Sequence, residues 1–224
     1  MTRTILSSLV LLGTLPVVSP AADLSKYRDF QLGTTLAAVV KQTGAETQPK
    51  NLHLRPALIQ QLEWRPRPLG PSKQMEAVED VAFTFYEGSL FRIAVRYDRY
   101  QTEGLTGSDV VEAISATYGQ PLPPAAAKVT TDPGAYSEPL EILARWEDPE
   151  YSFELVRSSY GPSYKLTGSL KAIETKAAAA AVEARRLDDE EAPQRDAARI
   201  VAEEASAKGK LEKARQLNKP KFRP

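Results

Sequence analysis

Few side chains in this sequence are suited to acid–base or metal chemistry at neutral pH. His53 is the only histidine, and the chain has no cysteine. A serine nucleophile would depend on His53, and no Gly-x-Ser-x-Gly turn is present to expose such a serine. One histidine without cysteines leaves too few nitrogen and sulfur ligands for a typical zinc site. We expect His53 to be an ordinary surface or edge residue of a strand, facing away from Leu52 and Leu54.

Carboxylates are the remaining candidates for catalysis. Hydrolysis of a glycosidic bond needs only two Asp or Glu side chains at a defined separation. The pairs Glu79-Asp80 and Glu147-Asp148 fall at an expected strand start and an expected turn, where acidic residues are common for structural reasons. No pattern brings two of these carboxylates together. A carboxylate-dependent hydrolase is therefore an alternative function, and the absence of EF-hand and phosphate-loop patterns predicts neither a metal site nor a cofactor.

A set of arginines and tyrosines favours binding over catalysis. Both residue types are enriched where proteins contact protein partners. Arg92 and Arg96 should share the outward side of a β-hairpin, with the other members of the set nearby. The candidate binding residues are Tyr86, Arg92, Arg96, Tyr97, Arg99 and Tyr100. The alternative is that the rings belong to the core or a sheet edge and that the arginines extend along the surface.

The first predicted hairpin carries this set. Its apolar residues alternate along two strands: Val81, Phe83 and Phe85, then Phe91, Ile93, Val95 and Tyr97. A two-residue loop at Glu87-Gly88 would place Phe83 opposite Arg92 and mix the two faces. We therefore expect a three-residue loop, Tyr86-Glu87-Gly88, which places Phe83 opposite Phe91.

Further strands should complete an antiparallel sheet. A second hairpin is expected around the turn Glu147-Asp148-Pro149-Glu150. Its predicted pairs are Trp146 with Tyr151, Ala144 with Phe153, and Ile142 with Leu155. Leu58, Leu62 and Trp64 indicate another strand, and Tyr164 to Leu170 indicate a last one.

Two short amphipathic helices precede these strands. The first follows Gly33-Thr34-Thr35 and ends at Gly44, and the second starts within Gly104-Leu105-Thr106-Gly107-Ser108 and ends at Gly119. Each has a Thr or Ser at its start and a Gly at its end, which are typical helix caps. The similarity predicts a duplicated helix-plus-sheet unit over residues 30–100 and 104–169, although such caps also arise by chance. The fold class is α+β, with one domain over residues 23–169.

The C-terminal part should be helical. Residues 170–217 are rich in Ala, Glu, Lys and Arg and lack a sustained heptad pattern. We expect a helix that docks through Leu170 and Ile173 and becomes solvated further on, with a break or kink at Pro193. A short basic tail, residues 218–224, follows. The helix is either a charged, solvated element without a binding role or a spacer or partner-binding helix.

The N-terminus predicts export. Residues 1–21 combine Arg3, an apolar stretch and a small-residue site, as signal peptides do. The chain has 29 basic and 29 acidic residues and therefore no overall basic field that would attract nucleic acid. Without a cysteine there is no lipid-attachment site. We expect a periplasmic or secreted protein with no stable membrane span once the signal is removed.

The order helix, strands, helix, strands resembles a known tandem arrangement. With Leu32-Gly33-Thr34-Thr35 to Gly44 and Gly107-Ser108 to Tyr118-Gly119 leading the units, the chain resembles the beta-lactamase inhibitor protein type. It is also similar to the small outer-membrane assembly lipoproteins of the SmpA/OmlA type. It departs from both, because it has neither a lipid-attached cysteine nor disulfides.

A second likeness is to uncharacterised bacterial exported proteins that share a Phe-x-Leu-Gly start and a Lys-Pro-Lys-Phe-Arg-Pro end, and it implies no activity. No functional residue is transferred from any of these families. The first expectation is a non-enzymatic periplasmic or secreted module that presents a sheet face to a protein partner in the cell envelope. The alternatives are the carboxylate hydrolase and an envelope spacer that acts through the C-terminal helix.

Overall fold

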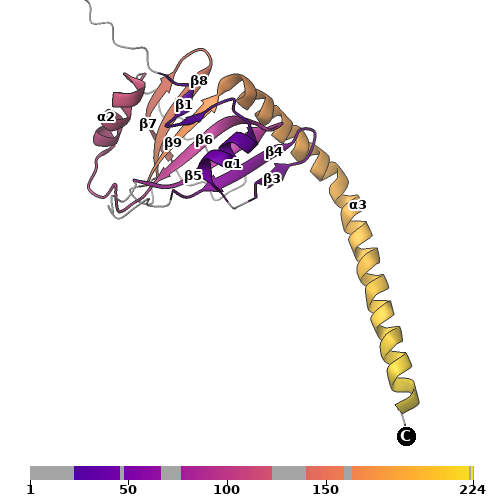
Figure 1. The fold of residues 1–224 in the computed structure, drawn as a ribbon. Helices are drawn as coiled ribbons and strands as arrows, with labels where there is room; N and C mark the ends of the chain where they lie inside the picture. The colour runs from indigo at the N-terminus through magenta and orange to yellow at the C-terminus, as the bar shows by residue number, and fades with distance from the viewer. Residues whose placement is uncertain are drawn as a thin grey trace, which may run out of the picture.

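The computed structural model describes residues 23–45, 48–66, 77–122, 140–158, 163–221 and 223. The predicted signal peptide, residues 1–21, lies outside the described residues. The elements are β1 (Lys26–Tyr27), β2 (Phe30–Gln31), α1 (Leu36–Thr43), β3 (Lys50–His53), β4 (Ile59–Trp64), β5 (Val78–Tyr86), β6 (Ser89–Tyr97), α2 (Gly107–Tyr118), β7 (Leu140–Glu147), β8 (Tyr151–Ser158), β9 (Tyr164–Leu170), α3 (Lys171–Asn218) and a 3-10 turn, Lys219–Lys221. The predicted α+β class is confirmed (Figure 1).

The centre of the fold is an antiparallel sheet of seven strands in the order β3-β4-β5-β6-β9-β8-β7. Helices α1 and α2 both pack on one face of this sheet, where Val39, Val110 and Ile114 join the main core. The first turns of α3 pack on the opposite face, where Ala177 and Ala180 join a smaller cluster. Beyond the sheet, α3 projects away from the rest of the molecule (Figure 1).

The strand order matches what a duplicated unit would produce. The chain runs α1, β3, β4, β5, β6 in its first half and α2, β7, β8, β9 in its second half, and β3 has no counterpart among the described strands. The last strands of the two halves, β6 and β9, are antiparallel neighbours at the centre of the sheet. The halves are therefore arranged about an approximate two-fold axis between these strands. Descent of both units from one ancestral unit stays a prediction.

Local capping explains both short helices. The hydroxyl of Thr35 accepts a hydrogen bond from the Ala38 amide, 3.3 Å away, and Gly44 ends α1 in the left-handed conformation. In α2 the Thr106 side chain accepts from the Asp109 amide, and the Asp109 carboxylate accepts from the Thr106 amide at 2.7 Å. The predicted helix starts and ends are thus confirmed.

The loop of the first hairpin differs from our prediction. It contains two residues, Glu87 and Gly88, with φ values of 49° and 79°, and Tyr86 pairs with Ser89. This backbone twist matches the right-handed twist of the flanking strands. The predicted loop of three residues is wrong.

A β-bulge in β6 lets the apolar residues Phe83 and Ile93 lie opposite each other although the loop has only two residues. The register shifts between Thr84 and Phe85, so that Phe91 is an extra residue and Phe83 pairs with Ile93 instead of Phe91. The bulge turns Phe91 to the face that α3 covers, where it is 3% exposed. The predicted pairing requires an unbroken ladder of hydrogen bonds, and the bulge interrupts it.

The second hairpin also pairs differently from our prediction. Trp146 lies opposite Phe153 rather than Tyr151. The Asp148 carboxylate accepts hydrogen bonds from the backbone amides of Glu150 and Tyr151, at 2.8 Å and 2.6 Å. These bonds tighten the turn to Pro149-Glu150, and Trp146 lies opposite a residue two positions further along β8 than predicted. The predicted four-residue turn is wrong.

Pro193 does not break α3, which continues from Lys171 to Asn218. Figure 1 shows the helix bending where it leaves the sheet. The Arg195 side chain donates to the carbonyl oxygen of Asp188 at 2.8 Å, so that a contact spans the two sides of Pro193. As predicted, Leu170 and Ile173 anchor the start of the helix. All described side chains from residue 193 to residue 221 are exposed.

Candidate functional site

One face of the sheet is left largely uncovered by the described helices, and we call it the open face. It lies opposite α1 and α2, and α3 covers only the end of it near Phe91 and Ile59. Strand register places one row of residues straight across six strands: Glu63, Ala82, Ala94, Thr167, Glu154 and Arg145. Side chains on one face of a strand recur at every second residue. The next rows on the open face therefore lie two residues before and two residues after this row on each strand.

The centre of the open face consists of small side chains. Ala82, Ala94 and Thr167 are cross-strand neighbours on β5, β6 and β9, and all three are partly exposed. Short side chains flanked by longer ones leave the middle of the face lower than its border. A partner can therefore bring its own side chains close to the sheet here.

The border of the open face is charged and ion-paired. Arg96 lies 3.2 Å from Glu79 and also pairs with Asp80. On the far side, Arg145 on β7 pairs with Glu154 on β8, and this carboxylate raises the pKa of the arginine. Exposed pairs of this kind contribute at most about 1 kcal/mol to stability, so their side chains exchange partners at low cost.

The predicted binding residues are divided between the two faces. Arg92 and Arg96 share the open face, as expected. However, Arg92 donates from Nε to the Glu174 carboxylate of α3 at 3.1 Å and lies over the Phe91 ring. Tyr86 packs against the cluster beneath α3. Helix α3 therefore occupies the Arg92 end of the predicted surface.

The other predicted residues do not join the open face. Tyr97 packs against the main core on the side of α1 and α2, and burial raises its pKa well above the ordinary value. Arg99 and Tyr100 follow β6, where the guanidinium lies 5.1 Å from the ring centroid. Tyr100 is 67% exposed. Alternation placed Tyr97 with the apolar side of its strand, and this signal already favoured the core interpretation.

Sequence reasoning missed the alanine and threonine centre. Ala82, Ala94 and Thr167 have no chemistry that distinguishes them in a sequence. Only strand register brings them together, because Thr167 lies more than 70 residues after Ala94 in the chain. The pairing of β6 with β9 was the missing information.

The candidate catalytic carboxylates are engaged in structural contacts. Glu79 and Asp80 pair with Arg96, and Glu147 lies 3.1 Å from the Lys171 ammonium. Asp148 organises its turn, as described above. His53 ends β3, one of the two edge strands of the sheet, and is partly exposed. Within the described parts of the chain, no group of three or more His, Asp or Glu residues is arranged to hold a metal ion.

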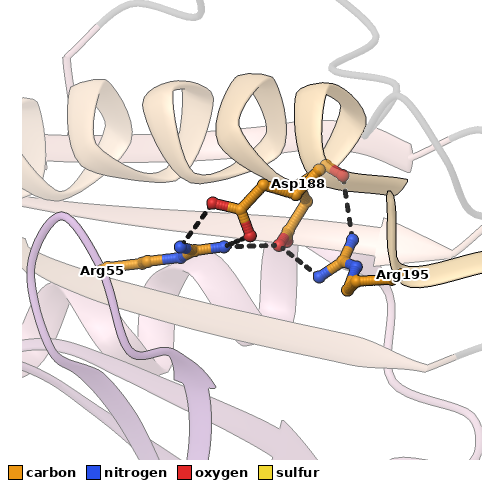
Figure 2. Close-up of polar contacts among 4 residues, drawn as sticks. Arg55, Asp188 and Arg195 are labelled. Carbon is orange, nitrogen blue, oxygen red and sulfur yellow. Dashed lines mark hydrogen bonds and ion pairs between the residues drawn. The ribbon is translucent and has the colours of Figure 1, made fainter. Parts of the chain in front are cut away.

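A second candidate surface is the projecting part of α3. Arg55, between β3 and β4, donates from Nη1 to the Glu191 carboxylate at 2.7 Å and lies 3.8 Å from Asp188. Arg195 lies 3.2 Å from the same Asp188 carboxylate, so that Asp188 stands between the two arginines (Figure 2). These contacts join α3 to the body at the start of its projecting part.

None of the helices in the described ranges is long and apolar enough to span a membrane.

Comparison of the chain with protein-family models, with curated proteins and with solved structures finds no match.

Proposed function

We propose that this protein is a non-enzymatic, exported binding module that takes up a protein partner on its open face. The observation that carries the proposal is the low centre of Ala82, Ala94 and Thr167 within a charged, ion-paired border. Among the described residues, α1 and α2 cover the other face of the sheet and no comparable layer packs over this centre, which leaves it accessible to a partner. A partner that lays side chains over the centre and exchanges ion pairs at the border fits this shape and charge.

Export to the periplasm or to the exterior is part of the same proposal. It rests on the basic, apolar and small-residue sequence of residues 1–21. The partner is therefore sought among proteins of the cell envelope. Mass spectrometry of the protein from an envelope fraction, with its N-terminus at about residue 22, would support this location.

The proposal is tested by filling the centre of the open face. Ala94→Arg puts a long, charged side chain in the middle of the row, where it holds a partner away from the sheet. Ala37→Arg makes the same substitution at an exposed site on α1, on the other side of the sheet. Immobilised wild-type protein and both variants are used to capture proteins from a cell-envelope extract.

We expect one protein to be retained by the wild type and by Ala37→Arg and to be lost with Ala94→Arg. Circular dichroism must show that both variants are folded. Retention of the same protein by Ala94→Arg, or no specific retention by the wild type, would contradict binding on the open face.

A second candidate function, an envelope spacer, is favoured by α3 alone. Residues 193–218 are helical and exposed throughout, which corresponds to a projection of about 40 Å at 1.5 Å per residue. Polar helices of this kind often bridge separate bodies. If deletion of residues 193–224 abolishes partner retention while Ala94→Arg preserves it, the spacer function replaces the binding face.

A further inference from the structure

The projecting helix has its charges segregated along its length. Residues 188–191 are four consecutive acids, which we call the acidic block. Residues 208–215, the basic block, carry Lys208, Lys210, Lys213 and Arg215 against the single acid Glu212. The ion pairs that the structure shows for Asp188, Glu190 and Glu191 leave their side chains at least 39% exposed. Both blocks are therefore accessible along α3.

The midpoint between the two blocks is apolar. The blocks are centred 22 residues apart, which is about 33 Å along the helix, and the midpoint falls between Ile200 and Val201. These two side chains are 50% and 66% exposed, in a segment that is otherwise almost entirely small or charged. Exposed β-branched residues contribute little to a solvated helix, and Ala would form it better.

One face of the helix carries a residue from the acidic block, one from the apolar midpoint and one from the basic block. Asp189, Ile200 and Leu211 are spaced eleven residues apart, which is close to three full helical turns. They therefore lie nearly in line, with an acid at one end, an isoleucine in the middle and a leucine within the basic block. Leu211 is 71% exposed.

A second copy of this helix is the partner that matches all of these features. In an antiparallel pair centred between Ile200 and Val201, residues 188–191 of one copy lie opposite residues 210–213 of the other. Both charge contacts then occur twice, and the apolar midpoints meet each other. A uniformly anionic partner would attract the basic block but repel the acidic block, and a parallel pair would oppose like charges along its whole length.

We propose that α3 is a self-association element and that two copies of this chain pair antiparallel through residues 188–215. The Arg55 contacts with Glu191 and Asp188 place the start of this segment beside the body, so that the rest of the segment extends beyond it (Figure 1). The inference uses no residue of the open face and stands apart from the proposed partner binding. In the dimer, the two open faces belong to bodies at opposite ends of the helix pair.

The experiment uses the purified protein and takes advantage of its lack of cysteine. Single variants Asp189→Cys, Ile200→Cys and Leu211→Cys are oxidised separately and as a mixture of the first and third. We expect Ile200→Cys to form a disulfide with itself, because only the midpoint faces its own copy. Asp189→Cys and Leu211→Cys should cross-link with each other in the mixture but not with themselves. Self-linking of all three variants indicates a parallel pair, and linking of none indicates no pair. Either result overturns the proposal.

A second measurement follows the mass of the protein by sedimentation. We expect twice the mass of one chain, a dissociation constant that rises with salt, and a further rise of at least about tenfold for Ile200→Glu, which places two charges at the apolar midpoint. Ala202→Glu adds the same charge on the opposite side of the helix and should leave the dimer unchanged. A monomeric wild-type protein, or equal dimers for Ile200→Glu and the wild type, would overturn the proposal.

Discussion

Single residues decide how the two faces of the sheet are used. Phe91 is an extra residue in its strand, and this bulge gives α3 an aromatic side chain to pack against. Gly168 on β9 contributes by having no side chain, because the Phe153 ring lies where a side chain at position 168 would begin. The Phe153 ring in turn stacks on Tyr118 of α2, with centroids 4.4 Å apart. The absence of a side chain at residue 168 thus allows the sheet and α2 to pack closely.

We predict that Gly168→Ala destabilises the protein by roughly 1–3 kcal/mol, since the new methyl group overlaps the Phe153 ring and forces it to move. Chemical denaturation followed by fluorescence measures the free energy of unfolding. Gly209→Ala is the matched control, because no atom lies within 4 Å of the added methyl group and the site is in the exposed helix. Equal stability of Gly168→Ala and the wild type would show that the ring moves without cost.

At the scale of elements, hydrogen bonds at helix ends and in turns set the boundaries. The reciprocal bonds between Thr106 and Asp109 begin α2, and the Asp109 carboxylate also lies in the first turn, where the helix dipole favours an acid. Hydrogen bonds from the Thr106 hydroxyl and amide lower the pKa of Asp109 below its ordinary value. The same kind of contact explains the turn at Asp148 and the start of α1.

The lowered pKa of Asp109 predicts a pH-dependent contribution to stability. The ionised carboxylate stabilises the folded state at pH values above the unfolded pKa of about 4, and this stabilisation is lost as the pH falls from there through the lower folded pKa. The difference in unfolding midpoint between the wild type and Asp109→Asn should therefore be largest at neutral pH and shrink below pH 4. Glu112→Gln, at an exposed site one turn further along α2, should show no such trend. A constant difference across this range would mean that the charge of Asp109 is not involved.

The whole molecule combines a packed body with a helix that is only partly integrated into it. Its two clusters of buried residues lie on opposite faces of one sheet, and the described side chains from residue 193 onward are all exposed. The projecting part of α3 therefore buries no described side chain against the body and should add little to the stability of the body.

Two changes, one in the projecting part of α3 and one beneath its docked part, should therefore affect the stability of the body differently. Deletion of residues 193–224 should leave the unfolding midpoint of the body unchanged, since every described side chain in this range is exposed. Phe91→Ala should lower the free energy of unfolding by about 3 kcal/mol, because it leaves a cavity beneath α3. Thermal unfolding monitored by circular dichroism compares the two proteins at a concentration where both are monomeric. A large loss of stability on deletion would show that the projecting helix packs on the body.

The sequence by itself was enough to predict the α+β class, the two capped helices, the last strand and the long C-terminal helix that docks only at its start. These features depend on local signals: Thr106 and Gly44 cap helices wherever they occur, and strict alternation marks a strand. The Arg92 and Arg96 pair was also placed correctly on one face, because neighbouring alternate positions on a strand share a side.

Only the tertiary structure decided the register of the hairpins and the neighbours of each strand. The bulge at Phe91 is specified by competition between turn geometry and packing on both faces of the sheet, and neither is visible in one strand alone. The pairing of β6 with β9 joins Ala94 to Thr167 across the centre of the open face. The docking of α3 over Arg92 likewise depends on Phe91 and Ile59, which are distant in sequence from Ala177. Contacts between distant segments arise from the packing of the complete chain, so the candidate surface emerged only when the sheet was assembled.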